Sequence, residues 1–478
     1  MELMNFSTLT LEIGAVLLGL VLLALGLLLP SRKKGAVGIV ASVGLALLLG
    51  LSFVSPGSAG PFFKGQYFND GLAVVFKQIF LLGALLVTLM SQSFSKRFEH
   101  ARSEYFVLLA FSLVGMMGIV GASDFLTFYI ALELMSLPLV VLTAFERSSG
   151  RSTEAGVKYV LLGAMSSAVL LFGLSYLYGL TGSFAYADIA AAFAKDGSSP
   201  LALLGGVFVL AGIAFKVAAV PFHMWSPDIY EGAPAPITAF LAIGSKAAGF
   251  AALVRIFPTV LLPLGGGITT LLVLLAALSM VIGNLSALAQ TNMKRLLAYS
   301  SIAHAGYMLL GIIAANGAGT NALVYYLILY LLANAGAFAA ITAWSDISGS
   351  DEIASFKGMW KRSPFLASTF VVCLLSLAGI PPAAGFLGKF FLFAEIARQG
   401  MLWLVALALA MSVVSLYYYI SVIKALVADP AEGETKKLAL PLPIKLVISF
   451  CVVATVILGV LPGPIVDWIS FATSSLPK

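Results

Sequence analysis

Residues 215–250 read FKVAAVPFHMWSPDIYEGAPAPITAFLAIGSKAAGF, and this stretch decides the fold. An apolar run reaches Pro221, gives way to prolines, a histidine, a tryptophan and a glycine, and then resumes as a second apolar run. Proline lacks a backbone donor and clashes with the preceding turn, so a helix is interrupted here. In a bilayer the freed backbone groups must be satisfied by protein or water. We therefore predict a broken transmembrane helix beside a polar cavity.

A second interruption of the same kind lies in LSLAGIPPAAGFLGKFFLFAE (375–395), where Pro381 and Pro382 follow Gly379 in mid-run. The two breaks fall in corresponding positions of two blocks of five predicted spans, which is the sequence signature of an inverted repeat. Because five is odd, successive blocks enter the membrane from opposite sides. The repeat rests on the spacing of the breaks, since no convincing residue-level identity joins the blocks.

The composition excludes a water-facing globular protein. Of the 478 residues, 60% are hydrophobic and only 10% are charged, whereas a soluble domain carries about 25% charged residues. At roughly 20 apolar residues per crossing, the apolar windows predict about 14 membrane spans. They are expected at 9–29, 36–54, 71–93, 104–122, 124–145, 157–180, 201–221, 234–256, 267–289, 296–315, 321–342, 364–394, 400–426 and 441–461.

The predicted fold is an all-α polytopic membrane protein with two inverted five-helix repeats, spans 4–8 and 9–13, each containing a broken helix. The expected segments are 1–103 (helices 1–3), 104–256 (repeat 1), 257–426 (repeat 2) and 427–478 (helix 14). The longest polar connections, at 55–70, 181–200, 343–363 and 427–440, are too short for an extramembrane domain. Any function must therefore lie in the helix bundle or in partner subunits.

The basic residues set the topology. With 14 spans, loops after odd-numbered spans hold eighteen of the 27 lysines and arginines, the opposite side holds five, and four lysines fall within spans. Because cytoplasmic loops carry the excess of Lys and Arg, both termini are expected on the outer side. A bacterial inner membrane and a multi-pass protein are the default expectation, and the net charge of +6 is interpreted as topology and not as nucleic-acid binding.

Several kinds of chemistry have no motif in this chain. Cys373 and Cys451 both lie in apolar runs, and no Cys/His pattern is present that would hold zinc, an iron–sulfur cluster or haem. There is also no phosphate-binding loop and no serine or cysteine nucleophile constellation. We expect no cofactor or metal in this chain, and the remaining ionisable residues fit ion movement better than bond making.

Two of those residues form the first candidate group. Glu133 lies near the middle of YIALELMSLPL (129–139), where a buried carboxylate must be protonated or paired. Lys216 lies five residues before Pro221, in the broken span. Burial disfavours a charged lysine whereas a nearby carboxylate favours it, and this competition suits a proton switch. The alternative for Glu133 is a structural ion pair.

The second candidate group lies farther along the chain. Lys246 falls in mid-span, flanked by Gly244 and Gly249, and Lys389 follows the double-proline break by seven residues; snorkelling to an interface is the alternative for both. His223 at the first break and His304 in mid-span are possible relays, or satisfied structural histidines. Two further residues, Lys77 and Glu154, are better explained by packing, snorkelling or a solvated face.

At these residues the sequence resembles a known family, the antiporter-like membrane subunits of respiratory complex I (NADH:quinone oxidoreductase). The stretch 215–250 carries the strongest likeness, supported by NMKRLLAYSSIAHAGYML (292–309), by 375–395 and by 129–139. The sequences PFHMWSPDIYEGAP and FLAIGSK resemble the subunit N branch of the family. No long trailing helix is expected after span 14, which argues against the subunit L branch. The likeness extends over spans 4 to 13.

The resemblance implies a proton-translocating subunit of a translocase. It implies a proton half-channel in each repeat, with Glu133 modulating Lys216, Lys246 at the central connection and Lys389 as the terminal proton carrier. It also implies that FMN, the iron–sulfur clusters and the quinone site belong to partner subunits, so that quinone reduction elsewhere drives this chain. The implied partners are the neighbouring antiporter-like and small membrane subunits, within the lipid bilayer.

Three alternatives remain open at this stage. The chain could be a subunit of a multisubunit cation/proton antiporter or a membrane-bound hydrogenase, which share the antiporter-like block. It could be a stand-alone secondary transporter with a substrate site between the broken helices. It could also be a scaffold whose buried charges only fix helix packing, in which case Lys216→Ala would harm assembly but not pumping per turnover.

Overall fold

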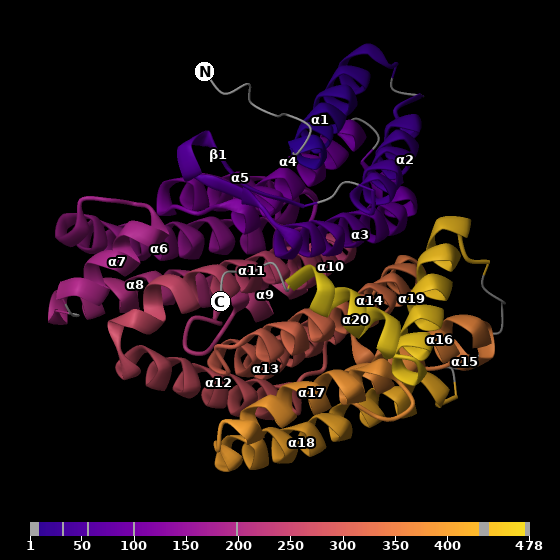
Figure 1. The fold of residues 1–478 in the computed structure, drawn as a ribbon. Helices are drawn as coiled ribbons and strands as arrows, with labels where there is room; N and C mark the ends of the chain where they lie inside the picture. The colour runs from indigo at the N-terminus through magenta and orange to yellow at the C-terminus, as the bar shows by residue number, and fades with distance from the viewer. Residues whose placement is uncertain are drawn as a thin grey trace.

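The computed structural model describes residues 9–30, 33–54, 57–98, 101–196, 199–429 and 439–473. Both chain ends and the basic residues Arg32, Lys436, Lys437 and Lys478 lie outside this range. The described chain is a bundle of long helices with one small β-hairpin (Figure 1). The prediction of an all-α polytopic membrane fold is therefore confirmed.

The elements follow one another without a separate domain. The first third contains α1 (Thr10–Leu28), α2 (Gly35–Ser52), β1 (Ser58–Phe62), β2 (Tyr67–Asn69), α3 (Gly71–Phe94), α4 (Arg102–Gly121), α5 (Phe125–Thr143) and α6 (Gly150–Thr181). The middle contains α7 (Tyr186–Asp196), α8 (Pro200–Val217), α9 (Trp225–Gly232), α10 (Ala235–Phe240), α11 (Lys246–Ile256), α12 (Gly266–Ala287), α13 (Met293–Ile313) and α14 (Gly317–Ser348). The last third contains α15 (Met359–Arg362), α16 (Pro364–Ala378), α17 (Ala384–Arg398), α18 (Leu402–Val427), α19 (Leu442–Val460) and α20 (Gly463–Thr473).

The number of spans agrees with the sequence. Among the described residues, 13 helices are long and apolar enough to cross a membrane. The short helices α16 and α17 together form the predicted broken span, which brings the arrangement to the expected fourteen. The division of the chain into two repeats at residue 256 stays a prediction, because it rests on the breaks alone.

Both predicted breaks are present, and their backbones are alike. Helix α8 ends at Val217, and Ala218 turns to a left-handed φ of +57° before α9 begins. Helix α16 ends at Ala378, and Gly379 turns to φ +84° before α17 begins. In each case a proline follows three residues after the turning residue. The carbonyl four residues before that proline, of Val217 or Ala378, therefore has no helical N–H donor. The peptide bonds before Pro221 and Pro382 are both cis.

A third irregularity was not predicted. The span from Ala235 to Leu264 is continuous, but its backbone widens to a π-helix (η5, Leu241–Ser245) directly before Lys246. π-Helical turns shift the register of a helix by one residue and are frequent at functional sites. The only sequence signal for this turn is Gly244, which permits it without requiring it.

Several helices begin at a polar side chain that accepts a backbone N–H of the first turn, the usual N-cap arrangement. The capping residues are Asp70 for α3, Asp124 for α5, Ser149 for α6, Ser199 for α8, Asn292 for α13 and Asn316 for α14. These caps fix where each span starts. They therefore fix the depth at which its inner polar residues lie.

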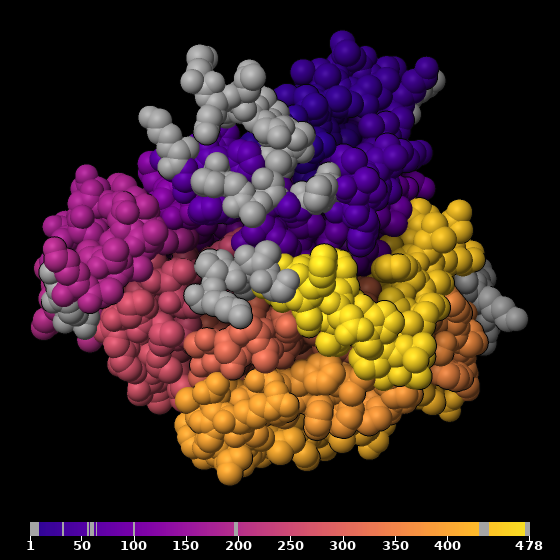
Figure 2. All heavy atoms as spheres, viewed as in Figure 1, coloured from indigo at the N-terminus to yellow at the C-terminus, as the bar shows by residue number. Residues whose placement is uncertain are grey.

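Helix α14 is the centre of the bundle. It has 32 residues, so it is about 48 Å long, and its most apolar window is entirely buried. It packs against α3, α10, α13, α16, α17 and α19, which surround it in Figure 1. In contrast, α1, α2, α6 and α18 bury little of their apolar surface and lie at the outside, with α1 and α2 projecting from the body in Figure 2. Their exposed apolar side chains suit contact with lipid.

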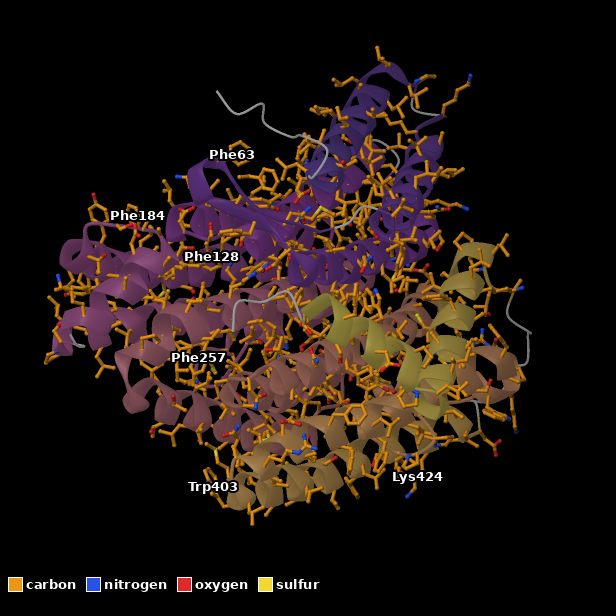
Figure 3. All side chains as sticks on the ribbon, viewed as in Figure 1. Phe63, Phe128, Phe184, Phe257, Trp403 and Lys424 are labelled. Carbon is orange, nitrogen blue, oxygen red and sulfur yellow. The ribbon has the colours of Figure 1, made fainter. Side chains whose placement is uncertain are left out.

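The ends of α18 show how the bundle fits a membrane. Trp403 and Lys424 lie at opposite ends of this helix (Figure 3). Trp403 is 57% exposed, and tryptophan is enriched at membrane interfaces. Lys424 belongs to the predicted Lys/Arg-rich side. The side of the membrane on which each end of α18 lies stays a prediction.

Several segments outside the predicted spans contain structure that the sequence did not predict. The connection 181–200 includes α7, the connection 343–363 includes α15, and the segment after the last span includes α20. The connection 55–70 includes the antiparallel hairpin of β1 and β2, in which Phe62 pairs with Tyr67. These elements are short, so the prediction that no extramembrane domain is present holds for the described residues.

Candidate functional site

The three candidate lysines are buried, and each lies close to a break or a π-helical turn in its span. Lys216 is 4% exposed and lies in the last turn of α8, just before the first break. Lys246 is 1% exposed and follows the π-helical turn. Lys389 is 4% exposed and lies on α17, after the second break. None of them reaches an outer surface of this chain, so snorkelling does not explain them.

Lys216 is held by a hydroxyl on a neighbouring span. Its Nζ donates to Ser136 Oγ of α5 over 2.8 Å, and Ser136 Oγ donates to the carbonyl of Leu132 over 2.5 Å. Pro138 lies inside α5 and leaves the carbonyl of Leu134 without its helical donor. Lys216 is bound to a hydroxyl of α5, and it lies at the negative end of the α8 dipole, which favours a cation.

Glu133 lies one turn from Ser136 on α5, but it bonds elsewhere. Ser167 Oγ of α6 donates to Glu133 Oε1 over 2.6 Å. Among the described residues no ion pair joins Glu133 to Lys216; each is held by a serine instead. Glu133 lies on α5 and Lys216 on α8, so a rotamer change of either side chain alters their separation. The modulating role expected for Glu133 stays a prediction.

Lys246 is bound to α13. Its Nζ donates to the backbone carbonyl of Ser301 over 2.8 Å and also contacts Ser301 Oγ. The same hydroxyl lies 3.4 Å from Tyr230 Oη of α9, so Ser301 joins the central lysine to the second half of the first broken span. The π-helical turn before Lys246 aims its side chain at α13.

His304 lies between two tyrosines from distant parts of the chain. Its Nδ1 is 2.6 Å from Tyr326 Oη of α14, and its Nε2 is 3.3 Å from Tyr419 Oη of α18. Tyr419 Oη also contacts Ser300 Oγ, one residue before Ser301. The ring of His304 is fully enclosed in the bundle, so its hydrogen bonds are made to these hydroxyls and not to solvent.

Lys389 closes the second break. Its Nζ donates to the carbonyl of Ala378 and to Ser412 Oγ, each over 2.9 Å. The ammonium also lies over the ring of Tyr307 of α13, 5.1 Å from the ring centroid. The lysine is thus held by the end of α16, by α18 and by α13.

One face of α13 lies between Lys246 of α11 and Lys389 of α17. It carries Ser300, Ser301, His304 and Tyr307, and residues three and four apart lie on the same side of a helix. From Ser300 to Tyr307 the helix rises about 10 Å. Hydroxyls and imidazole nitrogens both donate and accept protons, so this face offers a line of groups able to pass a proton between two lysines.

The remaining candidates have different surroundings. His223 lies in the first break and is 8% exposed, and within the described structure its Nδ1 has no hydrogen-bond partner. Lys77 does not snorkel, contrary to one expected alternative: it is fully buried, and it pairs with Glu12 and with Asn69 Oδ1. Glu154 is 63% exposed and pairs with Lys158 over 2.8 Å, which agrees with a solvated face.

Sequence reasoning did not single out the hydroxyl partners. The groups that hold the candidates are Ser136, Ser167, Ser412, Tyr230, Tyr307, Tyr326 and Tyr419. A hydroxyl in a long apolar span was the available signal, but tyrosines and serines are frequent in such spans. Which of them meet the candidates depends on how the helices pack, around α5, α6 and α8 for the first group and around α9, α13, α14 and α18 for the second.

The described residues include no group of three or more His, Cys, Asp or Glu that could hold a metal ion. Cys373 and Cys451 are buried free thiols. Within this part of the chain, no donor set for a metal ion or cluster is brought together. What the arrangement can do is bind protons at buried lysines and pass them along hydroxyls.

Comparison with known proteins agrees with this geometry. Residues 122–415 match the family model described as NADH:quinone oxidoreductase/Mrp antiporter, transmembrane. The chain belongs to this family. The matched range contains both breaks and all six candidate residues.

Relatives match over nearly the full length. NADH-quinone oxidoreductase subunit N of Desulforamulus reducens is 45% identical over 98% of both chains. The subunit of the same name from Moorella thermoacetica is 46% identical over 97% of both chains. A chain of respiratory complex I from Thermus thermophilus with bound aureothin is 37% identical, with a TM-score of 0.82, covering 96% of this chain and 98% of that chain. The prediction of the family from sequence is therefore confirmed.

Proposed function

We propose that this chain is the subunit N of an NADH:quinone oxidoreductase and moves protons across the membrane. The observation that supports this most directly is the set of three buried lysines, each close to a break or a π-helical turn in its span. The face of α13 that carries Ser301, His304 and Tyr307 connects two of them. The full-length similarity to relatives of that name gives the reaction in which the movement takes part.

In this proposal each lysine binds and releases a proton as its surroundings change. Lys216 takes up a proton when Glu133 lies near and loses it when the carboxylate moves away. Two unit charges about 4 Å apart interact by roughly 4 kcal/mol at an effective dielectric constant near 20. Moving one proton against 100 mV requires about 2.3 kcal/mol. The electrostatic change at one lysine is therefore large enough to drive a proton across.

We take the direction of transport from the predicted topology and the setting from the relatives of this chain. Protons enter from the Lys/Arg-rich side, which we assign to the cytoplasm, and leave on the outer side, where both termini lie. The host membrane is a bacterial inner membrane. Neighbouring antiporter-like and small membrane subunits flank the chain, and the flavin, iron–sulfur clusters and quinone site belong to partner subunits.

One other function within the family must be weighed. A chain of the Mrp complex from Dietzia sp. has a TM-score of 0.86 with this chain but is only 20% identical, so the likeness shows the fold alone. The subunit N relatives are more than twice as identical over the whole chain. This difference favours the oxidoreductase over the antiporter.

Isolation of the native assembly tests the setting. The chain is tagged in its own membrane, extracted in mild detergent, and its eluate assayed for flavin, iron–sulfur signals and NADH:quinone activity. We expect a redox arm to be recovered with the chain. Recovery with cation-antiporter subunits alone, or with no partner, would contradict the oxidoreductase proposal.

Proton stoichiometry tests the role of the lysines. Lys216→Ala, Lys246→Met and Lys389→Met are introduced separately, and protons moved per quinone reduced are measured in sealed vesicles holding the assembled complex. We expect fewer protons per quinone with quinone reduction retained at least in part. Normal stoichiometry in fully assembled variants would favour the scaffold alternative. Lys361→Met, an exposed lysine, is the control.

A further inference from the structure

A charged cavity of about 480 Å³ opens at the Lys/Arg-rich end of the bundle. It lies among the ends of α3, α5, α13 and α14, the linker between α9 and α10, and the segment 349–352. Its walls include Glu146, Glu231, Asp346 and Arg97. Side chains of this kind make the cavity polar enough to admit water.

Lys294 forms part of the floor of this cavity. Its side chain is only 7% exposed, and its Nζ lies 2.9 Å from Asp351 Oδ2. The same Nζ donates to the carbonyl of Ala233 over 3.0 Å. Ala233 belongs to the linker between α9 and α10, so the ammonium joins three separate elements at one point.

Asp351 is held on the rim by its own backbone and by a hydroxyl. The N–H of Met293 donates to the carbonyl of Asp351 over 2.8 Å, and Ser345 Oγ donates to Asp351 Oδ1 over 2.6 Å. The carboxylate is 24% exposed, so water can solvate it without any movement of the segment. The lysine is therefore the movable partner of this ion pair.

Helix stability does not account for a lysine at this position. Lys294 lies in the first turn of α13, where the helix dipole disfavours a cation. Burial of an ammonium is a further cost, which one carboxylate and one carbonyl offset. An apolar residue at this position would carry neither cost.

The elements around Lys294 lead directly to the central lysine. Ser301 lies seven residues farther along α13, about 10 Å away along the helix axis, and it holds Lys246. Ala298 lies between them on the same side of the helix, since residues three and four apart share one face. The other wall, α9, brings Tyr230 to within 3.4 Å of Ser301 Oγ.

We propose that this cavity is the vestibule through which protons reach Lys246, and that the Lys294–Asp351 ion pair is its gate. With the pair formed, the ammonium fills the floor between α13 and the α9–α10 linker. When Lys294 swings into the cavity towards its carboxylates, the route along α13 to Ser301 opens. This inference rests on the proposed function, because it names the inlet of the same proton route.

The test measures passive proton leak in the assembled complex. Sealed vesicles carry an imposed pH gradient, no electron donor is added, and the decay of the gradient is followed. Asp351→Asn is the main variant because it is nearly isosteric and retains the Ser345 and backbone contacts. Lys294→Met is the second variant, and Lys294→Arg is the conservative rescue.

The result expected is a severalfold faster decay in Asp351→Asn and Lys294→Met, wild-type decay in Lys294→Arg, and loss of the leak when Lys246→Met is added. Lys361→Met and Asp429→Asn, which break an exposed ion pair, are the matched controls and should not leak. Wild-type decay in Asp351→Asn, or a leak that persists with Lys246→Met, would overturn the gate.

A second measurement decides the matter without a gradient. Ala298→Cys is treated with a small membrane-impermeant thiol reagent from the Lys/Arg-rich side, with Ser350→Cys in the vestibule as the positive control. Labelling of residue 298 should require Asp351→Asn, and equal labelling with and without it would contradict the gate. The single variant Lys246→Met separates the two proposals: if it pumps normally, the proposed function fails whatever the leak shows.

Discussion

The ammonium of Lys389 donates over 2.9 Å to the carbonyl of Ala378, across the break between α16 and α17. In an unbroken helix that carbonyl would accept the N–H of residue 382, but residue 382 is proline and has none. The lysine therefore replaces the missing backbone donor. A proton-binding group and a helix break that requires a donor thus stabilise one another.

Gly379 is the residue through which this arrangement can be tested. Its φ is +84°, and a Cβ added to it would lie 3.0 Å from Lys389 Cδ. We expect Gly379→Ala to lose about 1 kcal/mol from the left-handed backbone alone and, in addition, to displace Lys389 and lower the protons moved per quinone. Thermal unfolding and proton stoichiometry are measured on the assembled complex.

The matched control for this variant is Gly400→Ala. Gly400 has φ +78°, and nothing lies within 4 Å of an added Cβ. It should show the backbone loss without any change in stoichiometry. Equal stoichiometry in both variants would mean that the contact with Gly379 does not position Lys389.

Ser301→Ala removes one of the two acceptors of Lys246. The backbone carbonyl of Ser301 remains, so the lysine stays buried with a single partner. A hydrogen bond to a charged group contributes about 1.5–3 kcal/mol, so we expect proton transfer through Lys246 to slow by roughly tenfold or more while assembly is kept. Ser42→Ala is the control, because Ser42 is buried and bonded to Gln92 far from the lysines. An unchanged pumping rate in Ser301→Ala would remove this hydroxyl from the route.

The sequence alone was sufficient to predict the two breaks, the number of spans and the burial of the lysines. These features depend on local chemistry: proline cannot continue a helix, and a charge inside an apolar run stands out. The π-helical turn before Lys246 could not be predicted, because its sequence, LAIGS, is also an ordinary helix sequence.

The partners of the candidates could not be predicted for a different reason. Tyr419 meets His304 across 115 residues of sequence, and Lys216 meets Ser136 across 80. Such contacts depend on how helices cross and on how each is rotated about its axis. Periodicity indicates that a face is buried, but it does not indicate which buried face it meets.

Two adjacent tyrosines on α14 allow a sharp test of the His304 link. Tyr326 Oη lies 2.6 Å from His304 Nδ1, whereas Tyr325 Oη donates to the carbonyl of Leu458 on α19 over 2.9 Å. We expect Tyr326→Phe to lower the protons moved per quinone, because His304 loses the hydroxyl that fixes its orientation. Tyr325→Phe removes the same atom one residue away and should leave the stoichiometry unchanged. If both variants lose the same amount, the effect is one of packing on α14 and not of the histidine.

The ion pair of Asp70 and Arg255 should make the stability of the complex depend on pH. Arg255 Nη1 donates to Asp70 Oδ2 over 2.6 Å, and the side chains are 14% and 12% exposed. Burial alone would raise the pKa of Asp70, but the hydrogen bonds and charge of Arg255 outweigh burial and hold that pKa below its usual value. A lowered carboxyl pKa stabilises the folded state at pH values above the pKa of the unfolded chain, about 3.9, and this contribution is lost as the pH falls through the lowered pKa.

Asp70→Asn keeps an acceptor for the α3 cap but removes the charge, so we expect it to destabilise the complex by about 2 kcal/mol at pH 7, less than for a fully buried pair. The unfolding temperatures of the wild type and of Asp70→Asn should differ by the same amount from pH 7 to about 5, and they should converge below about pH 4. A difference that persists at the lowest pH would show that the ion pair is not its source.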